Sequence, residues 1–236
     1  MLTSSLYTTR AVLFDLDGTL LDTAPDMVRA LDLLVQEEGA PTVDHEIARQ
    51  HVSHGAGALV TLGFGDSQSE SDHKRRCQRY LSLYEQNLCV DTALFEGMAD
   101  TLAFLENHGI LWGIVTNKPA FLTEPLVKAL ELEHRASTVI SGDSLPQRKP
   151  HPQPLFHAAN ECNVLSTECI YVGDAERDIV AGNRAGMITL LASYGYIEAT
   201  DQPEKWGANG VIESAQEILD WLSESTELEL DIQRAN

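Results

Sequence analysis

The stretch that decides the fold is AVLFDLDGTLLDT, residues 11–23. Residues 11–14 are apolar and run directly into two carboxylates, Asp15 and Asp17. A short apolar run that ends in polar residues is typical of a buried strand in a parallel sheet. Gly18 allows a sharp turn that points both carboxylates at one place. Because buried carboxylates without a charge partner are costly, this strand end predicts a functional site.

The rest of the chain predicts an α/β fold with an inserted helical block. A helix is expected from Thr23, with Pro25 and Asp26 in its first turn, and it ends near Gly39. From there to Val90 no segment has the pattern of a strand. Strands then alternate with helices, and this alternation predicts a doubly wound parallel sheet. The expected later strands are ILWGIV, STVI, CIYVGD, MITLLA and GVI.

This order predicts three parts of the chain. Residues 1–21 and 93–224 form the α/β core, residues 22–92 form a helical cap, and residues 225–236 form an acidic tail. If the cap gates a site on the core, the linkers at residues 21–24 and 94–98 act as hinges.

Composition narrows the class of protein. The 236 residues carry a formal net charge of −20, which disfavours nucleic acid and anionic membranes as partners. No apolar stretch approaches the ~20 residues that span a bilayer, and the N-terminus lacks a secretory signal, so a cytoplasmic location is expected. The four cysteines show no metal-binding spacing and are expected to be free thiols. A monomer and a homodimer both stay open.

Polar residues follow three of the later strands. Because the carboxyl ends of strands in an open parallel sheet meet at one edge, these residues are expected to converge with Asp15 and Asp17. They are Thr116, Asn117 and Lys118 after ILWGIV, Arg148 and Lys149 after STVI, and Asp174, Arg177 and Asp178 after CIYVG.

Four motifs in this order, DLDGTLLDT, VTNKP, RKPHP and GDAERD, resemble motifs I to IV of the haloacid dehalogenase (HAD) superfamily of phosphatases. The helical block occupies the place of that family's C1 cap. The resemblance covers nearly the whole chain apart from the acidic tail, and it implies a HAD-like Rossmannoid core. Within the superfamily the chain is most similar to the phosphoglycolate phosphatases. The stretches LFEGM, LWGIVTNKP, YGYI and WGA look like the branch that contains N-acetylmuramic acid 6-phosphate phosphatase.

The resemblance implies a Mg²⁺-dependent phosphomonoester hydrolase that forms an aspartyl phosphate. Asp15 would be the nucleophile, and Asp17 would donate a proton to the leaving oxygen and later take one from water. Thr116 and Asn117 would donate to phosphoryl oxygens, and Lys149 would balance negative charge.

A magnesium site is the second implication. Its ligands would be the Asp15 carboxylate, the Asp17 backbone carbonyl and Asp174, with Asp178 orienting these groups or joining through water. The roles of Lys118, Arg148 and Arg177 stay open between this site and a general contribution to local charge.

The cap is expected to select the substrate, a small phosphorylated metabolite. Its stretch from residue 51 to 57 could place Ser53 and Gly55 against a substrate or could merely connect two helices. Four cap arginines could contact a substrate carboxylate or form a solvated helix face. They are Arg49, Arg75, Arg76 and Arg79.

Several reactions compete within the superfamily. Phosphoglycolate would suit a small pocket lined by cations, whereas a muramic acid phosphate or another sugar phosphate would need a roomier one. A phosphotransferase similar to β-phosphoglucomutase retains the same motifs and stays open. A dehalogenase would lack Asp17, and a phosphonate-cleaving relative would need a lysine early in the cap, where none precedes Lys74.

From another class, the rival is a non-catalytic switch phosphorylated on an aspartate. A receiver-like switch would not carry its acceptor on the first strand, a D-x-D-G-T motif or a cap.

Overall fold

The computed structural model describes residues 9–222, and its centre is a six-stranded sheet in the order β5-β4-β1-β6-β7-β8. Every neighbouring pair is parallel, so the predicted doubly wound parallel sheet is confirmed. The chain leaves β1 toward β4 on one side and later returns toward β6 on the other, which opens a crevice at the carboxyl end of β1. The strands are β1 (Ala11–Phe14), β4 (Leu111–Val115), β5 (Thr138–Ile140), β6 (Cys169–Gly173), β7 (Ile188–Ala192) and β8 (Gly210–Ile212).

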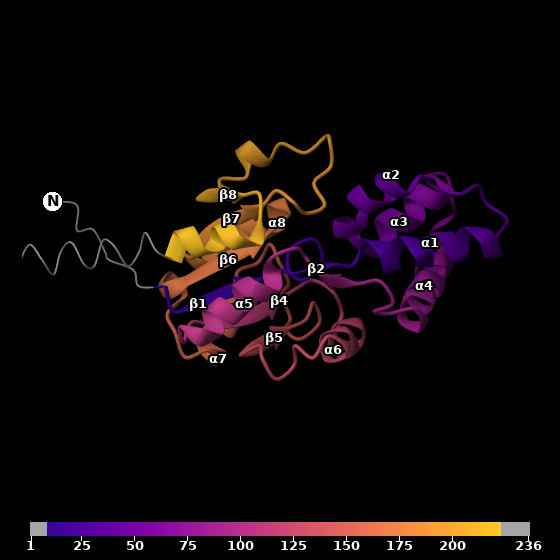
Figure 1. Ribbon diagram of the computed structural model, residues 1–236. Coiled ribbons are helices and arrows are strands. Elements are labelled where there is room, and N and C mark those ends of the chain that lie inside the picture. Colours follow the sequence, from indigo (N-terminus) through magenta and orange to yellow (C-terminus); the bar gives the residue numbers. More distant parts are fainter. Residues whose placement is uncertain (1–8, 223–236) are drawn as a thin grey trace, which may run out of the picture.

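Helices cover both faces of the sheet (Figure 1). Alternate residues of a strand point to opposite faces, so Val12 and Phe14 pack on one side and Ala11 and Leu13 on the other. The first side is covered by α5 (Met98–Asn107), α6 (Ala120–Ala129) and residues 215–222. The second side is covered by α7 (Gln153–Glu161) and α8 (Glu176–Ala185). β1 is therefore fully buried, as its apolar run predicts.

Four helices lie beside the sheet and share a hydrophobic cluster of their own (Figure 1). They are α1 (Ala24–Glu37), α2 (His45–Gln50), α3 (Gly55–Phe64) and α4 (Glu70–Gln86). The chain enters this group through β2 (Leu21–Asp22) and leaves it through β3 (Ala93–Leu94), and these two short strands pair antiparallel. The two connections to the core therefore lie side by side.

The shorter elements complete the described chain. Four 3₁₀ turns are η1 (Val52–His54), η2 (Ser166–Glu168), η3 (Pro203–Lys205) and η4 (Ala215–Glu217). All four cysteine thiols are free, as expected. No helix within residues 9–222 has both the length and the apolar character needed to cross a bilayer. The acidic tail predicted at residues 225–236 lies outside the described residues.

Candidate active site

The Asp15 carboxylate lies at the carboxyl end of β1 and is buried. Its Oδ1 accepts a hydrogen bond from the Leu16 backbone N–H at 2.7 Å and lies 2.8 Å from Lys149 Nζ. Its Oδ2 accepts no hydrogen bond within the described residues and lies 3.9 Å from the Arg177 guanidinium. Burial alone would raise the pKa of Asp15, but Lys149 and Arg177 hold that pKa below its ordinary value. Asp15 is therefore an ionised carboxylate with one oxygen free to react.

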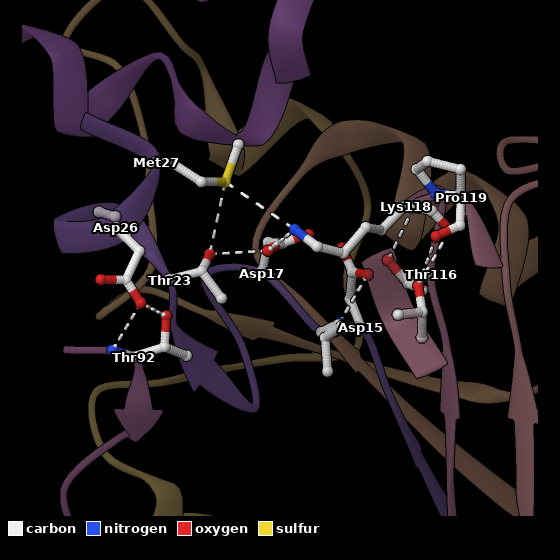
Figure 2. A network of polar contacts seen from close by, with 12 residues as sticks. Asp15, Asp17, Thr23, Asp26, Met27, Thr92, Thr116, Lys118 and Pro119 are labelled. Atoms are coloured by element: carbon white, nitrogen blue, oxygen red, sulfur yellow. Dashed lines mark hydrogen bonds and ion pairs between the residues drawn. The ribbon is translucent and has the colours of Figure 1, made fainter. Parts of the chain in front are cut away.

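Asp17 lies next to Asp15 and is bound by two donors (Figure 2). Its Oδ1 accepts hydrogen bonds from Thr23 Oγ1 at 2.7 Å and from Lys118 Nζ at 2.9 Å. The Lys118 ammonium also lies 4.5 Å from the centre of the Tyr84 ring, which is a favourable cation–π distance. Lys118, which the sequence leaves open, is thus a buried cation paired with the second carboxylate of the motif.

Lys149 is fully buried among acceptors. Its Nζ lies 2.8 Å from Asp15 Oδ1, 2.7 Å from Asp178 Oδ1 and 2.8 Å from the Tyr171 hydroxyl oxygen. The Tyr171 hydroxyl in turn donates to the Val115 carbonyl oxygen at 2.9 Å. Tyr171 is a site residue that the sequence does not single out, because it lies within the apolar run of β6. It fixes the ammonium between the two carboxylates.

Asn117 and Thr116, which follow β4, make different contacts. Asn117 Nδ2 donates to the Lys149 carbonyl oxygen at 2.9 Å, and the Lys149 N–H donates to Asn117 Oδ1 at 3.1 Å. This side chain, expected to contact phosphoryl oxygens, is held by the Lys149 backbone and also lines the cavity above Asp15, and its Nδ2 carries a second N–H. Thr116 Oγ1 accepts a hydrogen bond from the Lys118 N–H at 3.1 Å, so its own hydroxyl hydrogen stays available for a ligand.

The carboxylates of Asp15, Asp174 and Asp178 lie close together. Asp15, Asp174 and Asp178 each offer an oxygen within 4.8 Å of the others, and all three are buried. Burial, and repulsion by Asp15 and Asp178, raise the pKa of Asp174 to about 7. Asp174 Oδ2 accepts hydrogen bonds from Ser53 Oγ at 2.8 Å and from the Tyr196 N–H at 2.9 Å, whereas its buried Oδ1 has no partner within residues 9–222.

This donor set fits a hard divalent cation. Oxygen ligands and an unpaired buried carboxylate oxygen are what Mg²⁺ binds in proteins. The Asp17 carbonyl oxygen accepts no hydrogen bond within the described residues, so it is free to join Asp15 and Asp174. Both Asp178 oxygens are already engaged, one by Lys149 and the other by the Ala175 N–H at 3.1 Å, which favours an orienting role.

Gly18 is required for this packing. Its φ is +81°, and a Cβ there would lie 2.1 Å from Asp174 Oδ2. A side chain at this position would displace the carboxylate, so only glycine fits between the two strand ends.

A cavity of about 580 Å³ opens above these groups, between the sheet edge and the inserted elements α1, η1, α3 and α4. Ser53 and Gly55 both line it, on the side of the inserted helices. Its remaining lining includes Thr116, Arg148 and Arg177 from the core and the apolar or aromatic side chains of Met27, Tyr80, Leu81, Tyr84 and Leu122.

The four arginines expected to lie in a cap do not line this cavity. Arg75 and Arg76 pair with Glu38, and Arg79 pairs with Glu37, all across the α1–α4 contact. Arg49 pairs with Asp22 at 2.8 Å.

Comparison with known proteins agrees with this geometry. The model of the haloacid dehalogenase-like hydrolase family matches residues 12–192. N-acetylmuramic acid 6-phosphate phosphatase of Pseudomonas putida is 40% identical over 210 residues, which cover 89% of this chain and 94% of that protein. Phosphoglycolate phosphatase of Xanthomonas campestris is 40% identical over 209 residues, with the same two coverages of 89% and 94%.

Solved structures share the fold. A predicted phosphoglycolate phosphatase from Haemophilus somnus has a TM-score of 0.80 at 25% identity, covering 90% of this chain and 97% of that one. A haloacid dehalogenase-like family protein from Streptococcus pneumoniae has a TM-score of 0.77 at 23% identity, covering 91% and 98%. Since the family model spans most of the chain and holds all four motifs, the chain belongs to the haloacid dehalogenase-like hydrolases.

Proposed function

We propose that this protein is a Mg²⁺-dependent phosphomonoester hydrolase that acts through a phosphorylated Asp15. The observation that carries the proposal is an ionised Asp15 whose Oδ2 is free, beside a buried carboxylate cluster and two cations. Two relatives that match this chain over nearly their full length are named as phosphatases, which supports the same reaction class.

In the first step, Asp15 Oδ2 attacks phosphorus and the bond to the ester oxygen breaks. Asp17 hands its proton to that oxygen, so the alcohol leaves neutral. The Thr116 hydroxyl donates to a phosphoryl oxygen, and Lys149 balances the charge of Asp15 and the phosphoryl group. Asn117 contributes by holding the Lys149 backbone. Arg177, 3.9 Å from Asp15 Oδ2, is near enough to a bound phosphoryl group to add positive charge.

In the second step, Asp17 takes a proton from water as the water oxygen attacks phosphorus, and the Asp15 carboxylate is released. Lys118 pairs with the ionised form of Asp17 that this step requires. When bound to Asp15, Asp174 and the Asp17 carbonyl, Mg²⁺ would neutralise the repulsion between the nucleophile and the phosphate dianion.

The proposal includes a division of the chain. Residues 22–92 would form the cap, and the flanking segments would form the catalytic core, with hinges at the paired β2 and β3 linkers. Ser53 and Gly55 would border the substrate from the cap side. A cytoplasmic location is part of the proposal, and cell fractionation tests it.

For the substrate we propose phosphoglycolate first. The cations Lys118, Arg148 and Arg177 around the cavity suit a small acid phosphate. A muramic acid 6-phosphate or another sugar phosphate is the second candidate, because a cavity of about 580 Å³ with aromatic walls has room for a sugar. Side-by-side kcat/KM values decide between them. A low kcat/KM for both compounds would contradict both assignments.

The reaction itself is tested with p-nitrophenyl phosphate. We expect phosphate release that requires Mg²⁺, stops with EDTA and falls at least about 1,000-fold in Asp15→Asn, because the amide is a poor nucleophile. Asp32→Asn on α1, remote from the cavity, is the matched control and should retain wild-type turnover.

Three results would contradict the proposed reaction. Turnover that survives Asp15→Asn would refute the nucleophile. One stoichiometric phosphorylation without turnover would favour the switch. Transfer of phosphate to a sugar phosphate in place of water would favour the mutase reaction.

A further inference from the structure

Tyr196 links the metal-binding cluster to the first cap linker. It lies in the loop after β7, and only 3% of it is exposed. Its backbone N–H donates to Asp174 Oδ2 at 2.9 Å. Its hydroxyl donates to Asp22 Oδ1 at 2.7 Å and accepts from the Ala24 N–H, the first residue of α1, at 2.9 Å. One residue therefore binds a carboxylate of the site and the entrance to the cap.

The cap reaches the same loop from the other side. Arg49 of α2 donates to Asp22 Oδ1 at 2.8 Å, and its guanidinium carbon lies 5.0 Å from the centre of the Tyr196 ring. His54 Nε2 lies 2.9 Å from Glu198 Oε1, two residues beyond Tyr196. Ser53 Oγ donates to Asp174 Oδ2, the same oxygen that accepts the Tyr196 N–H. These contacts require α2 and η1 to lie against the loop.

The loop and Asp174 pack too closely to move independently. A Cβ on Gly195 would lie 2.4 Å from Asp174 Cβ and 2.4 Å from the Gly18 carbonyl oxygen. A Cβ on Gly18 would lie 2.8 Å from Tyr196 Cδ2. A displacement of the loop would therefore displace Asp174 with it.

We propose that Tyr196 is a positioning residue that couples closure of the cap to the orientation of Asp174. This deepens the proposed function, on which it rests for the role of Asp174. The Tyr196 hydroxyl and ring hold Asp22 and Arg49 in the closed arrangement, while its backbone holds Asp174. Opening the cap separates Arg49 from the ring and Ser53 from Asp174. Occupation of the carboxylate cluster by Mg²⁺ then favours the closed cap, and the cap favours a correctly oriented Asp174.

The test compares Tyr196→Phe with Tyr194→Phe. Tyr194 lies in the same loop, but its hydroxyl donates to the Thr19 carbonyl oxygen at 3.1 Å and to no cap residue. Electron–electron distance measurements between spin labels on Glu70→Cys of the cap and Glu133→Cys of the core report the closed fraction, in a background with Cys77 and Cys89 replaced by serine. Both label sites are exposed.

Because a hydrogen bond to a carboxylate is lost, we expect Tyr196→Phe to lower the closed-to-open ratio about tenfold and to raise KM severalfold. Mg²⁺ alone should raise the closed fraction of the wild type and of Tyr194→Phe, but much less in Tyr196→Phe. Arg49→Met changes no residue of the loop and should reproduce the loss of closure. The double variant of Tyr196→Phe and Arg49→Met should lose little more closure than either single variant.

Equal closed fractions and equal KM values in the two tyrosine variants would overturn the coupling, as would a full Mg²⁺ response in Tyr196→Phe. The label distances do not depend on turnover. A wild type that hydrolyses no phosphate ester would therefore refute the proposed function without deciding the coupling.

Discussion

At the scale of single residues, the site is a balance of charges in a buried space. Lys149 lies between Asp15 and Asp178, and Lys118 pairs with Asp17. Each cation meets a carboxylate from a different segment of the chain. Asp174 keeps a buried oxygen, Oδ1, without a partner among the described residues, and this is where an added divalent ion would complete the balance.

Lys149→Met tests this balance. The change leaves Asp15 and Asp178 buried without their shared cation, and loss of one member of a buried ion pair costs about 3–5 kcal/mol. We expect the Tm in EDTA to fall by about 10 °C, since 1 kcal/mol shifts the Tm of a domain of this size by about 2–4 °C. Mg²⁺ should restore more Tm in the variant than it adds to the wild type. Calorimetry measures the Tm, and Lys205→Met, which replaces an exposed lysine, is the control. An equal fall in Tm in both variants would contradict the proposed charge balance.

The sequence predicts which charged residues converge, because each follows a strand of one parallel sheet. It does not predict the tyrosines. Tyr171 has the same apolar context as its neighbours in β6, and only the register of β6 with β1 places it beside Lys149. Tyr196 contacts Asp22 across 174 residues of sequence, a proximity that no local pattern encodes. Asn117 contacts a backbone, and backbone positions follow only from the folded loops.

At the scale of elements, Asp26 links the start of α1 to the segment between α4 and β3, where the chain leaves the inserted helices. Its carboxylate accepts hydrogen bonds from the N–H groups of Val90, Asp91 and Thr92 and from Thr92 Oγ1 (Figure 2 shows the Thr92 contacts). Burial alone would raise the pKa of Asp26, but the hydrogen bonds from Thr92, Asp91 and Val90 together hold it below its ordinary value. From the sequence, Asp26 is predicted only to be an acidic residue in the first turn of the helix, and its contacts with residues 90–92 are not predicted.

Asp26 Oδ1 also accepts a hydrogen bond from the Arg29 guanidinium at 2.7 Å. Asp26→Asn should destabilise the fold by about 2–3 kcal/mol at pH 7, because an amide cannot accept all five bonds. A carboxylate whose pKa is lower in the folded state stabilises fully above its unfolded pKa, about 3.9, and loses that contribution as the pH falls through its folded pKa. The difference from wild type should therefore hold from pH 7 to pH 5 and shrink below pH 4. Urea unfolding over this range measures it.

Asp32→Asn is the control for this pH series. Asp32 lies on the same helix, its side chain is 34% exposed, and its partner is His45, so its loss should cost under about 1 kcal/mol. A deficit in Asp26→Asn that stays constant down to pH 3 would show that packing, and not the charge, is responsible.

The element pattern of the sequence is confirmed for all six strands of the main sheet and for the helical character of the insert. The β2–β3 pair is missed. Two-residue strands carry no periodicity, and their pairing depends on the insert returning to its point of departure. Once seen, the pair explains how two linkers predicted as hinges could move together, because they are adjacent and hydrogen-bonded.

At the scale of the whole molecule, charge is distributed unevenly. The chain has 36 acidic and 16 basic residues, yet four of the basic residues, Lys118, Arg148, Lys149 and Arg177, line the cavity above Asp15. A phosphate dianion is attracted at short range by these groups and repelled at long range by the net charge of −20.

Changing the salt concentration distinguishes the long-range repulsion from the short-range attraction. At 0.1 M ionic strength the Debye length is about 10 Å, so the repulsive far field is screened while contacts inside the buried cavity are much less affected. We expect kcat/KM for a phosphate monoester to rise about two- to threefold between 10 and 100 mM NaCl at fixed free Mg²⁺, with kcat nearly unchanged. Steady-state kinetics at both salt concentrations measure this. A steady fall in kcat/KM over the same range would mean that the local cations dominate at every distance, and that the acidic exterior has no part in admitting the substrate.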